Sequence, residues 1–368
     1  MNNGQKKIKV AFVLGALNHG GAENLILDIC RNMDNAAFEC ACIYRKDGNL
    51  SDTFRRANIN MIHVPRKGGL LTYMWQLRQT IIQENIDILH SQTASNTLIL
   101  GLILLGSRKK IVTTIHSFSF LKANELYKSF IFWVSKKVLF VTNYQMNMYI
   151  NKYPSRLRDK CQVVYNGIDC KKFQQIYSLP DIYQNSNLLR FCVVGNIRKA
   201  RTYEVILETI HLLKLENIQN FNLYIVGNTP AEEQPLLQQY KALCRQYEID
   251  DVVHFVGSRD DVPAILQHSN IYIMSSIETF GISIVEAIMS GIPVVVNDFD
   301  VMKEVTEDGK LSLLFKTGDA TDLANRIKHV LNNLEDYKRN AKTHAEYTID
   351  RYSIENCINQ LTKVYSSI

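Results

Sequence analysis

Glu278 and Glu286 are the two side chains whose spacing most clearly suggests chemistry in this sequence. They lie in residues 275–293, a segment that is typical of a strand end, a loop, a helix and the next strand. The helix is expected from about Ser283 to Gly291, because a glycine commonly ends a helix. Glu278 then falls in the loop at the carboxyl end of a strand, where parallel sheets bind ligands. Glu286 falls in the first turn of the helix.

The backbone between the two glutamates adds a set of anion donors. The N–H groups of Phe280, Gly281 and Ile282 lie where the helix begins, and such groups have no acceptor within the helix. Glu286 has a second interpretation, because Ser283 and Glu286 fit a capping box in which the carboxylate only satisfies helix donors. Glu278 has no comparable structural explanation.

A basic turn follows another expected strand, residues 189–194. Arg198, Lys199 and Arg201 place three cations within four residues just after Gly195. Arg can bind two phosphate oxygens at once, so this turn suits a diphosphate. A solvated basic turn without a ligand is the alternative.

Adjacent glycines follow the first expected strand, residues 8–14. Gly20 and Gly21 stand directly before a helical run, where glycine lets backbone N–H groups approach an anion closely. The spacing differs from the dinucleotide-binding fingerprint, and no acidic residue ends the second strand. A plain tight turn explains the glycines about equally well.

The elements that must position these residues alternate short β-branched runs with longer amphipathic segments, which is typical of parallel α/β units. The expected strands of the first half are 8–14, 61–64, 86–90, 111–115, 138–142 and 162–165. Its clearest expected helices are 22–32, 70–84 and 125–137. The strands of the second half are 189–194, 221–226, 252–256, 271–274, 293–296 and 311–315.

A polar stretch with a proline, residues 174–187, reads as a linker between the two halves. The sequence thus predicts two Rossmann-like α/β domains, 1–175 and 188–350, with a ligand cleft between them. A C-terminal helix at about 352–368 is expected to pack back on the first domain.

Composition excludes several classes of protein. The chain has 368 residues, of which 46% are hydrophobic and 21% charged, as in ordinary globular proteins. The longest apolar run, 98–105, is well short of the ~20 residues that cross a bilayer, and no signal segment is apparent. Eight scattered cysteines without a CxxC pair predict reduced thiols in a cytosol, with neither a disulfide framework nor a zinc site.

The net charge of +6 is unevenly distributed. Residues 1–180 contain 24 Lys and Arg against 11 Asp and Glu, a net +13, whereas residues 181–368 contain 18 against 25, a net −7. A basic half suggests an anionic partner, either a membrane surface or a nucleic acid. Two solvated surfaces of opposite bias are the alternative.

These motifs together resemble family 4 glycosyltransferases of the GT-B fold. The block E-TFGISIV-E followed by AIMSGIPVVV looks like the E-x7-E signature of that family. GALNHGGAE, TTIHS, VVYNGIDCKKF, HFVGSRDDVPAIL and KTGDATDLANRI resemble further family segments. The likeness extends over roughly residues 8 to 345.

The resemblance implies a role for each matching residue. Glu278 would bind sugar hydroxyls, Glu286 the ribose, and His116 the transferred sugar. Gly20 and Gly21 would lie near the donor phosphates and the acceptor. The donor contacts are completed by the set Arg198, Arg201, Phe280, Gly281 and Ile282.

Two positions depart from the family pattern. Asn196 stands where the family has Arg, and Arg201-Thr202 stands where it has Lys-Gly. Arg201 keeps the charge and is expected to be the first diphosphate ligand, with Arg198 second. An inactive relative of the family is the alternative, because Arg and Lys are not equivalent at a phosphate site.

The implied reaction moves a sugar from a nucleoside diphosphate sugar, with UDP favoured, to a hydroxyl, and retains the anomeric configuration. The catalytic residues would be Glu278, His116 and Arg201. No cofactor and no metal are expected, because Asp298 and Asp300, although spaced as in DxD metal sites, fit a loop better. A retaining sugar phosphorylase or a sugar-nucleotide epimerase on the same fold is the alternative. A nucleic-acid binder is disfavoured, because the cations are dispersed.

The acceptor is not specified by the motifs. The family resemblance fits a glycan or lipid-linked acceptor in bacterial surface polysaccharide assembly. Residues 122–137 mix Lys with aromatic side chains, which suggests a helix that lies on an anionic membrane. An ordinary helix packed through its aromatics is equally compatible. The expected location is the cytoplasm, with peripheral attachment to the inner face of the membrane.

Overall fold

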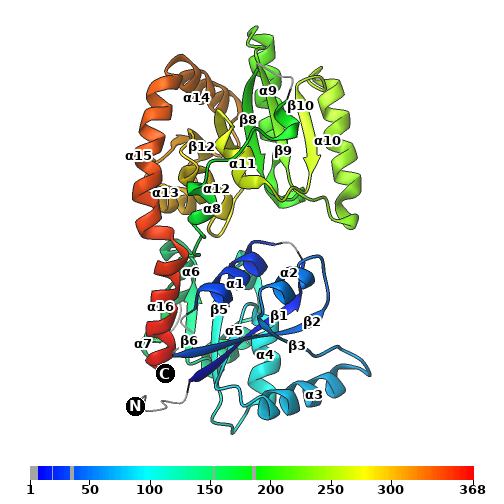
Figure 1. Ribbon diagram of the computed structural model, residues 1–368, viewed down its shortest axis with the longest axis vertical. Helices are drawn as coiled ribbons and strands as arrows, with labels where there is room; N and C mark the ends of the chain where they lie inside the picture. The colour runs from blue at the N-terminus through cyan, green and yellow to red at the C-terminus, as the bar shows by residue number, and fades with distance from the viewer. Residues whose placement is uncertain (1–6, 19, 34–36, 152–153, 185–187) are drawn as a thin grey trace. The chain divides into compact units, whose positions relative to one another are not determined.

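The structure is a computed structural model that describes residues 7–18, 20–33, 37–151, 154–184 and 188–368. It divides into two compact units, each with its own parallel sheet (Figure 1). The first unit comprises residues 1–168 and 354–368, and the second comprises 169–353. The division falls before the expected linker.

The expected linker belongs to the second unit, which corrects the domain bounds drawn from composition. The N–H of Tyr177 donates to Gln267 at 2.9 Å, and the hydroxyls of Tyr183 and Ser269 are 2.9 Å apart. Tyr183 is fully buried, with its ring edge against Tyr224. Aromatic anchors within a polar stretch hold it to the fold, and hydropathy alone did not reveal them.

In the described part of the first unit, seven parallel strands are arranged in the order β3-β2-β1-β4-β5-β6-β7. Their bounds are β1 Ile8–Ala16, β2 Phe38–Lys46, β3 Asn60–His63, β4 Ile88–Ser91, β5 Lys110–Ile115, β6 Lys137–Phe140 and β7 Cys161–Val163. The helices are α1 Gly21–Asn32, α2 Ser51–Arg56, α3 Leu70–Gln83, α4 Ala94–Ile103, α5 Glu125–Val134, α6 Asn143–Ile150, α7 Ser155–Arg158, α16 Ile354–Ser366 and the 3-10 turn η1 Phe118–Lys122.

Alternation along β1 divides the core of this unit between the two faces of the sheet. Val10 and Phe12 pack in one cluster with residues of α1 and α16. Ala11 and Val13 pack in another with residues of α3 and α4. Side chains that alternate in this way belong to a strand covered by helices on both faces. The return of α16 onto α1 adds the C-terminal residues to this layer (Figure 1).

In the second unit the described strands are arranged in the order β10-β9-β8-β11-β12-β13. Their bounds are β8 Leu189–Val194, β9 Phe221–Val226, β10 Val253–Gly257, β11 Ile271–Met274, β12 Val294–Asn297 and β13 Leu313–Phe315. The helices are α8 Lys171–Gln174, α9 Tyr203–Leu215, α10 Gln234–Gln246, α11 Val262–Gln267, α12 Ile282–Met289, α13 Asp300–Val305, α14 Ala320–Asn332 and α15 Leu334–Tyr352, with 3-10 turns η2 Asp181–Tyr183, η3 Lys199–Arg201 and η4 Ala231–Glu233.

All these strand pairs are parallel, so the carboxyl ends of the strands meet at one edge of each sheet. β8 pairs with both β9 and β11, which brings the loops after these strands together. In the first unit the loops after β1, β4 and β5 meet in the same way. These two edges position the residues that were singled out above.

Two predictions from the sequence were wrong. Strand β2 was not expected, because its run FECACIYRK has small side chains and charged flanks in place of a β-branched core. The expected helix 125–137 ends at Val134, and Lys137 begins β6. No described helix is long and apolar enough to cross a membrane.

Candidate functional site

Arg201 lies beside the carboxyl end of β8, directly against the backbone of Gly195, the glycine that follows the strand. A methyl group in place of the Gly195 hydrogen would overlap the Arg201 guanidinium, so the side chain lies directly against this backbone. The hydroxyl of Tyr203, at the start of α9, donates to the Gly195 carbonyl at 2.7 Å. Only glycine at position 195 leaves room for Arg201 in this place.

Arg201 and Glu278 form an ion pair in the second unit. The Arg201 Nη2 and Glu278 Oε1 atoms are 3.2 Å apart, and the two side chains are 23% and 26% exposed. Burial, the largest influence, lowers the pKa of Arg201, but the charge of Glu278 and neighbouring tyrosines outweigh it, and the pKa is raised. A cation and a carboxylate that are each about three-quarters buried are thus brought together from the loops after β8 and β11.

The loops that carry the pair are tied to one another by side-chain hydrogen bonds. Thr202 Oγ1 donates to the Ser275 carbonyl at 3.1 Å, and Ser275 Oγ donates to the Thr202 carbonyl at 3.0 Å. The fully buried amide of Asn297 donates to the carbonyls of Ser275 and Ser276 at 2.6 and 3.0 Å. These bonds fix the start of the Glu278 loop against the turn that holds Arg201.

Thr202 adopts a left-handed conformation, with φ 45° and ψ 47°. This region is costly for a β-branched residue, by about 1–3 kcal/mol, and favours glycine. The family pattern has glycine at this position, and here the reciprocal bonds with Ser275 hold threonine in the same conformation. The turn geometry is therefore kept although the residue type differs.

The other departure has a structural role too. The Asn196 side chain accepts the N–H of Asn228 at 3.1 Å and so joins the ends of β8 and β9. Arg198 is exposed at the N-terminal end of η3, and no contact of its side chain with Glu278 is observed. Of the two expected diphosphate ligands, the structure brings Arg201 to Glu278 and leaves Arg198 at the surface.

Helix α12 begins one residue earlier than expected, with Gly281 as its N-cap. Gly281 has φ 81°, and a methyl group there would lie 2.8 Å from the Ile284 side chain. The capping box that was the alternative interpretation of Glu286 is not formed, because Ser283 lies inside the helix, where its hydroxyl accepts from Tyr272 at 2.8 Å. The amides of Ile282 and Ser283 precede the first intrahelical bond, from Ile284 N–H to the Gly281 carbonyl at 3.0 Å.

Phe280 precedes the N-cap of α12, and Glu286 lies within the helix. Phe280 is buried, and its ring lies edge-on to Tyr352 with centroids 5.5 Å apart. Glu286 is half-buried at the start of the second turn of α12, later in the helix than expected, and its charge contributes to the raised pKa of Tyr272, after the larger effect of burial. Glu286 thus lies near the hydroxyl of Tyr272 and is no part of a helix cap.

In the first unit, three loop residues lie along the carboxyl edge of the sheet. Gly20 is the N-cap of α1 and Gly21 its first residue, whereas His19 of the same motif lies outside the described residues. His116 follows β5 directly, and Gln92 follows the neighbouring strand β4. The Nε2–H of His116 donates to Gln92 Oε1 at 2.8 Å, which fixes the ring tautomer.

A second histidine lies beneath this edge. The ring nitrogens of His90 bond the hydroxyls of Tyr365 and Thr114 at 2.6 and 2.7 Å. Burial lowers the pKa of His90 to about 3, with a smaller contribution from His116, and burial lowers the pKa of His116 to about 4. Both rings are therefore neutral in the folded protein at neutral pH.

We expect acid to destabilise the first unit through these two histidines. An unfolded histidine has a pKa of ~6.5, so between that pH and the lowered folded values the unfolded chain binds more protons. Each histidine then reduces the free energy of unfolding by about 2 kcal/mol between pH 7 and pH 5. Urea unfolding of the whole chain at the two pH values measures the loss, and His90→Gln should remove part of it. Equal stability at both pH values would show that the rings are not held neutral.

Asp298 and Asp300 each interact with a side chain of the second unit. Asp298 Oδ1 accepts from the N–H and hydroxyl of Thr317 at 2.9 and 2.8 Å, which lowers its pKa. Asp300, in the first turn of α13, lies 3.6 Å from Lys303. Within the described ranges, no cluster of three or more His, Cys, Asp or Glu side chains could hold a metal ion.

Sequence reasoning missed the residues that hold the site in place, namely Gln92, Thr202, Ser275 and Asn297. Three of them share one signal, a polar residue at or just after the end of a buried strand: Gln92 after β4, Ser275 after β11 and Asn297 at the end of β12. The signal for Thr202 was the glycine that the family pattern has at this position, since glycine commonly stands where the backbone is left-handed.

Two family models match the chain in succession. Glycosyltransferase Family 4 matches residues 19–172, and Glycosyl transferases group 1 matches residues 181–346. The O-antigen biosynthesis glycosyltransferase WclY of Escherichia coli is 23% identical, with 98% of this chain and 99% of that protein covered. The UDP-Gal:alpha-D-GlcNAc-diphosphoundecaprenol alpha-1,3-galactosyltransferase of Escherichia coli is 22% identical, with 90% and 89% covered.

A solved structure shares the fold of the chain. The crystal structure of Anabaena Alr3699/HepE in complex with UDP and glucose has a TM-score of 0.88 at 18% identity, and the match covers 98% of this chain and 100% of that one. The two parallel-sheet units are therefore those of the GT-B fold.

Proposed function

Since the chain belongs to the family 4 glycosyltransferases of the GT-B fold, we propose that it transfers a sugar from a UDP-sugar to a hydroxyl of a glycan or lipid-linked acceptor, with retention of anomeric configuration. The observation that carries the proposal is the ion pair of Arg201 with Glu278, set beside the first turn of α12. A cation that would bind phosphate and a carboxylate that would bind sugar hydroxyls thus lie next to each other. A sugar joined to a diphosphate presents both groups at one bond.

The donor diphosphate would lie against Arg201 and the first amides of α12. Arg201 would bind phosphate oxygens through two N–H groups, while Gly281 and Ile282 donate from the backbone. Both sets are fixed by the contacts of Gly195, Thr202 and Asn297 that were described above, so they require little rearrangement as negative charge develops. Stabilising the leaving group in this way is the main catalytic contribution we assign to the protein.

The remaining site residues would hold the sugar and the nucleoside. Glu278 accepts hydrogen bonds from sugar hydroxyls, and Glu286 accepts those of the ribose. His116 contacts the transferred sugar, with its tautomer set by Gln92. Gly20 and Gly21 let the start of α1 approach the phosphates and the acceptor.

Retention would proceed by attack on the face that the diphosphate leaves. The bond between the anomeric carbon and the phosphate oxygen breaks, the acceptor oxygen bonds to that carbon, and the acceptor proton passes to the departing phosphate oxygen. A double displacement needs a carboxylate free to act as nucleophile. Glu278 forms an ion pair with Arg201, which favours a single displacement on one face over a double displacement.

The names of two relatives and the description of one structural neighbour support the choice of donor and acceptor. One relative is named for UDP-galactose and a diphosphoundecaprenol-linked acceptor, another for O-antigen biosynthesis, and the structural neighbour is described with UDP and glucose. We propose the same classes for this chain, in the assembly of a bacterial surface polysaccharide at the cytoplasmic face of the membrane.

Activity is expected to survive removal of divalent metals, because Arg201 and the α12 amides supply the positive charge at the diphosphate. Turnover in excess EDTA should stay within about twofold of the untreated value, well under the 10²-fold scale of losing a fixed charge. The measurement is release of UDP from the donor in the presence of acceptor. Loss of activity on chelation that Mn²⁺ restores would contradict the proposal and implicate Asp298 and Asp300.

Glu286→Gln is expected to weaken nucleotide binding by roughly 10-fold, the scale of one lost hydrogen bond to a charged group. Because the capping box is not formed, the thermal midpoint of the free protein should stay close to that of the wild type. Calorimetric titration with UDP and with 2′-deoxy-UDP measures the effect, and the variant should discriminate less between the two. Equal affinity of variant and wild type for UDP would remove Glu286 from the ribose site.

A screen of UDP- and GDP-sugars for protection against heating tests the donor class. A ligand at 100 times its dissociation constant stabilises the folded state by about 2.7 kcal/mol, which raises the melting temperature by several degrees. UDP-sugars should protect the wild type and protect Arg201→Gln less. Protection by no nucleoside diphosphate sugar would overturn the assignment.

A further inference from the structure

The outward faces of helices α3, α4 and α5 in the first unit carry large apolar side chains that solvent reaches. Leu71 and Trp75 on α3 are 81% and 63% exposed, and Leu126 and Trp133 on α5 are 82% and 61% exposed. Leu102 on α4 is also exposed. Single exposed leucines need no explanation, but a set on three neighbouring helices does.

On α3 the exposed residues form one stripe. Leu71, Trp75 and Ile82 follow an i, i+4, i+11 spacing, which places them on a single side of the helix. Tyr73, Leu77 and Ile81 are buried on the opposite side, against the sheet. The outer side of the helix thus carries three large apolar side chains, with the exposed Arg78 among them, whereas a helix that only covers a sheet is polar outside.

The next two helices continue the pattern. Leu126, Phe130 and Trp133 are spaced i, i+4, i+7 on α5, away from its buried residues, and the rings of Phe130 and Trp133 are 5.9 Å apart. Leu102 on α4 and Leu105, which follows the end of that helix, are exposed. The helices contact their neighbours, α3 with α4 and α4 with α5, so the three stripes belong to one surface. We call this set of outward side chains on α3, α4 and α5 the apolar face.

Both tryptophans of the chain lie on the apolar face. The sequence has two, Trp75 and Trp133, and both are more than half exposed. Tryptophan favours the boundary between the hydrocarbon and the headgroups of a bilayer, because its ring is apolar and its N–H is polar. Its confinement to this face points to a lipid boundary.

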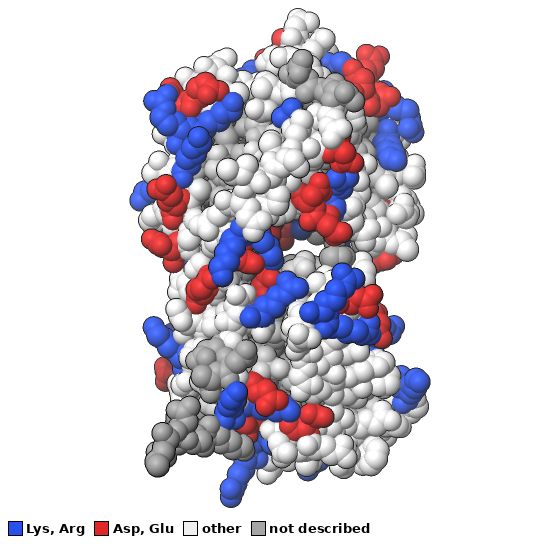
Figure 2. All heavy atoms as spheres, viewed as in Figure 1, with Lys and Arg blue, Asp and Glu red and all other residues white. Residues whose placement is uncertain are grey.

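The charge around the apolar face has one sign. Residues 61–137 contain ten Lys and Arg against three Asp and Glu, a net +7. Two of the three acids, Glu84 and Glu125, pair with Lys9 and Lys128 at 3.2 and 2.6 Å. Figure 2 shows few charged side chains over α3, at the lower edge of the view.

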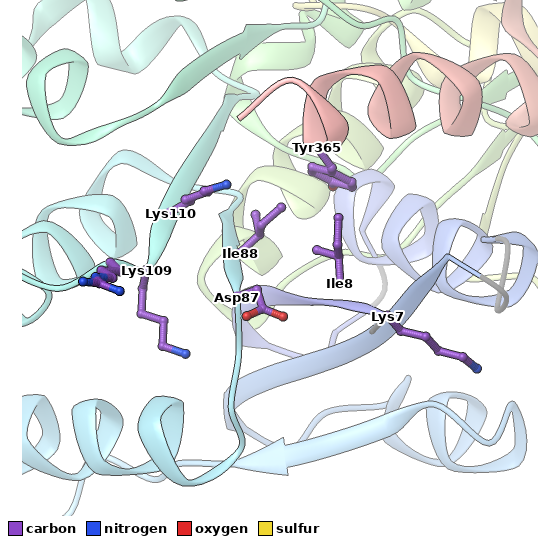
Figure 3. A pocket seen from close by; sticks show the side chains of 8 residues that line it. Lys7, Ile8, Asp87, Ile88, Lys109, Lys110 and Tyr365 are labelled. Atoms are coloured by element: carbon purple, nitrogen blue, oxygen red, sulfur yellow. The ribbon is translucent and has the colours of Figure 1, made fainter. Parts of the chain in front are cut away.

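Several cations lie just before or just after the helices that carry the apolar face. Arg66 and Lys67 precede α3 and are exposed, and Lys136 follows α5. After α4, Arg108 and Lys109 line a pocket together with Lys7, Lys110 and Asp87 (Figure 3). Four cations around one carboxylate give this pocket a net positive charge.

We propose that the apolar face docks on an anionic lipid bilayer, with the tryptophans and leucines in the headgroup boundary and the cations on lipid phosphates. Charge complementarity selects this occupant, because a second copy of the chain would bring a like charge of +7 against it. The surface replaces the single helix 122–137 that the sequence suggested, since Lys128 is buried and donates to the Leu121 carbonyl at 3.1 Å.

Docking would bring the first unit, which carries Gly20, Gly21 and His116 along the carboxyl edge of its sheet, to the surface that holds a lipid-linked substrate. The proposal goes beyond glycosyl transfer, and its test needs neither donor nor acceptor. Vesicle binding without sugar transfer would support this inference and contradict the proposed function. Sugar transfer without vesicle binding would contradict this inference and support the proposed function.

The test is flotation of the full chain with vesicles of phosphatidylcholine, alone or with about 30 mol% phosphatidylglycerol. The wild type should float with the anionic vesicles, with a blue shift of tryptophan fluorescence, and should bind neutral vesicles at least tenfold more weakly. Leu71→Ser/Trp75→Ser/Leu126→Ser should reduce binding to anionic vesicles at least tenfold. Arg66→Glu/Lys67→Glu/Arg108→Glu should remove the preference for anionic lipid, since each basic residue near the surface contributes roughly fivefold in affinity.

Matched controls use exposed residues of the second unit. Ile176→Ser/Leu215→Ser/Tyr347→Ser removes three apolar side chains that are 96%, 65% and 51% exposed, and binding should not change. Trp133→Phe leaves Trp75 as the sole tryptophan, whose emission must still shift to the blue. Failure of the wild type to float with anionic vesicles would overturn the proposal. So would concentration-dependent dimerisation, abolished by the Leu71/Trp75/Leu126 variant, in a protein that binds no vesicles.

Discussion

Glu278→Gln is expected to reduce kcat/KM for glycosyl transfer by about 10³-fold, the upper range for removing one fixed electrostatic contact at a transition state. The glutamine has the shape of glutamate but lacks the charge that holds sugar hydroxyls and the Arg201 guanidinium. The glutamine keeps the size of the side chain, which is 26% exposed, so the melting temperature should change little. Steady-state kinetics with a UDP-sugar and a thermal unfolding curve measure the two effects together.

Asp300→Asn is the matched control for Glu278→Gln. Asp300 is an acidic residue of the same unit, and its side chain is 58% exposed beside Lys303. The control should keep near-normal turnover, since we assign it no substrate contact. Turnover of Glu278→Gln within threefold of the wild type would remove Glu278 from the catalytic site.

Arg201→Gln is expected to lower kcat/KM by about 10²- to 10³-fold and to weaken UDP binding, because the diphosphate loses its fixed cation. Arg201→Lys should recover only part of the loss, since an ammonium group lacks the two-pronged geometry of the guanidinium. The effect should appear in kcat and in the calorimetric affinity for UDP. An unchanged affinity for UDP in Arg201→Gln would show that other groups bind the phosphates.

Gly195→Ala separates the position of Arg201 from its charge. A methyl group at this position would overlap the guanidinium, so the side chain must move although its charge is kept. We expect a loss of turnover close to that of Arg201→Gln. If Arg201→Gln and Glu278→Gln act on one bound donor, their effects in the double variant should be far from additive.

The sequence was sufficient for the parts of the fold that depend on hydrophobic periodicity. Runs such as 221–226 and 271–274 are strands in the structure with the same bounds, because buried parallel strands are apolar throughout. The E-x7-E segment also lies where it was expected, after β11 and into α12. Both features are local, and residue type is enough to reveal them.

Features that depend on tertiary contacts were not predictable in the same way. Lys128 is one of several cations in the segment 122–137, yet it is buried in the structure, where its ammonium group pairs with Glu125 and donates to the Leu121 carbonyl. Ser283 has the spacing of a cap, but Gly281 takes that place because its backbone adopts a positive φ. The apolar face also had no clear signal, since its residues are interleaved with the buried ones of three separate helices.

The account depends most directly on whether Arg201 and Glu278 catalyse transfer from a nucleoside diphosphate sugar. The decisive measurement uses a UDP-sugar that protects the protein against heating. UDP release from this donor is measured with and without a lipid-linked or glycan acceptor, and NMR gives the anomeric configuration of the product. We predict release that depends on the acceptor, an α-linked product from an α-linked donor, and loss of both in Glu278→Gln. Release that requires only inorganic phosphate, an inverted product, or equal release by wild type and Glu278→Gln would contradict it.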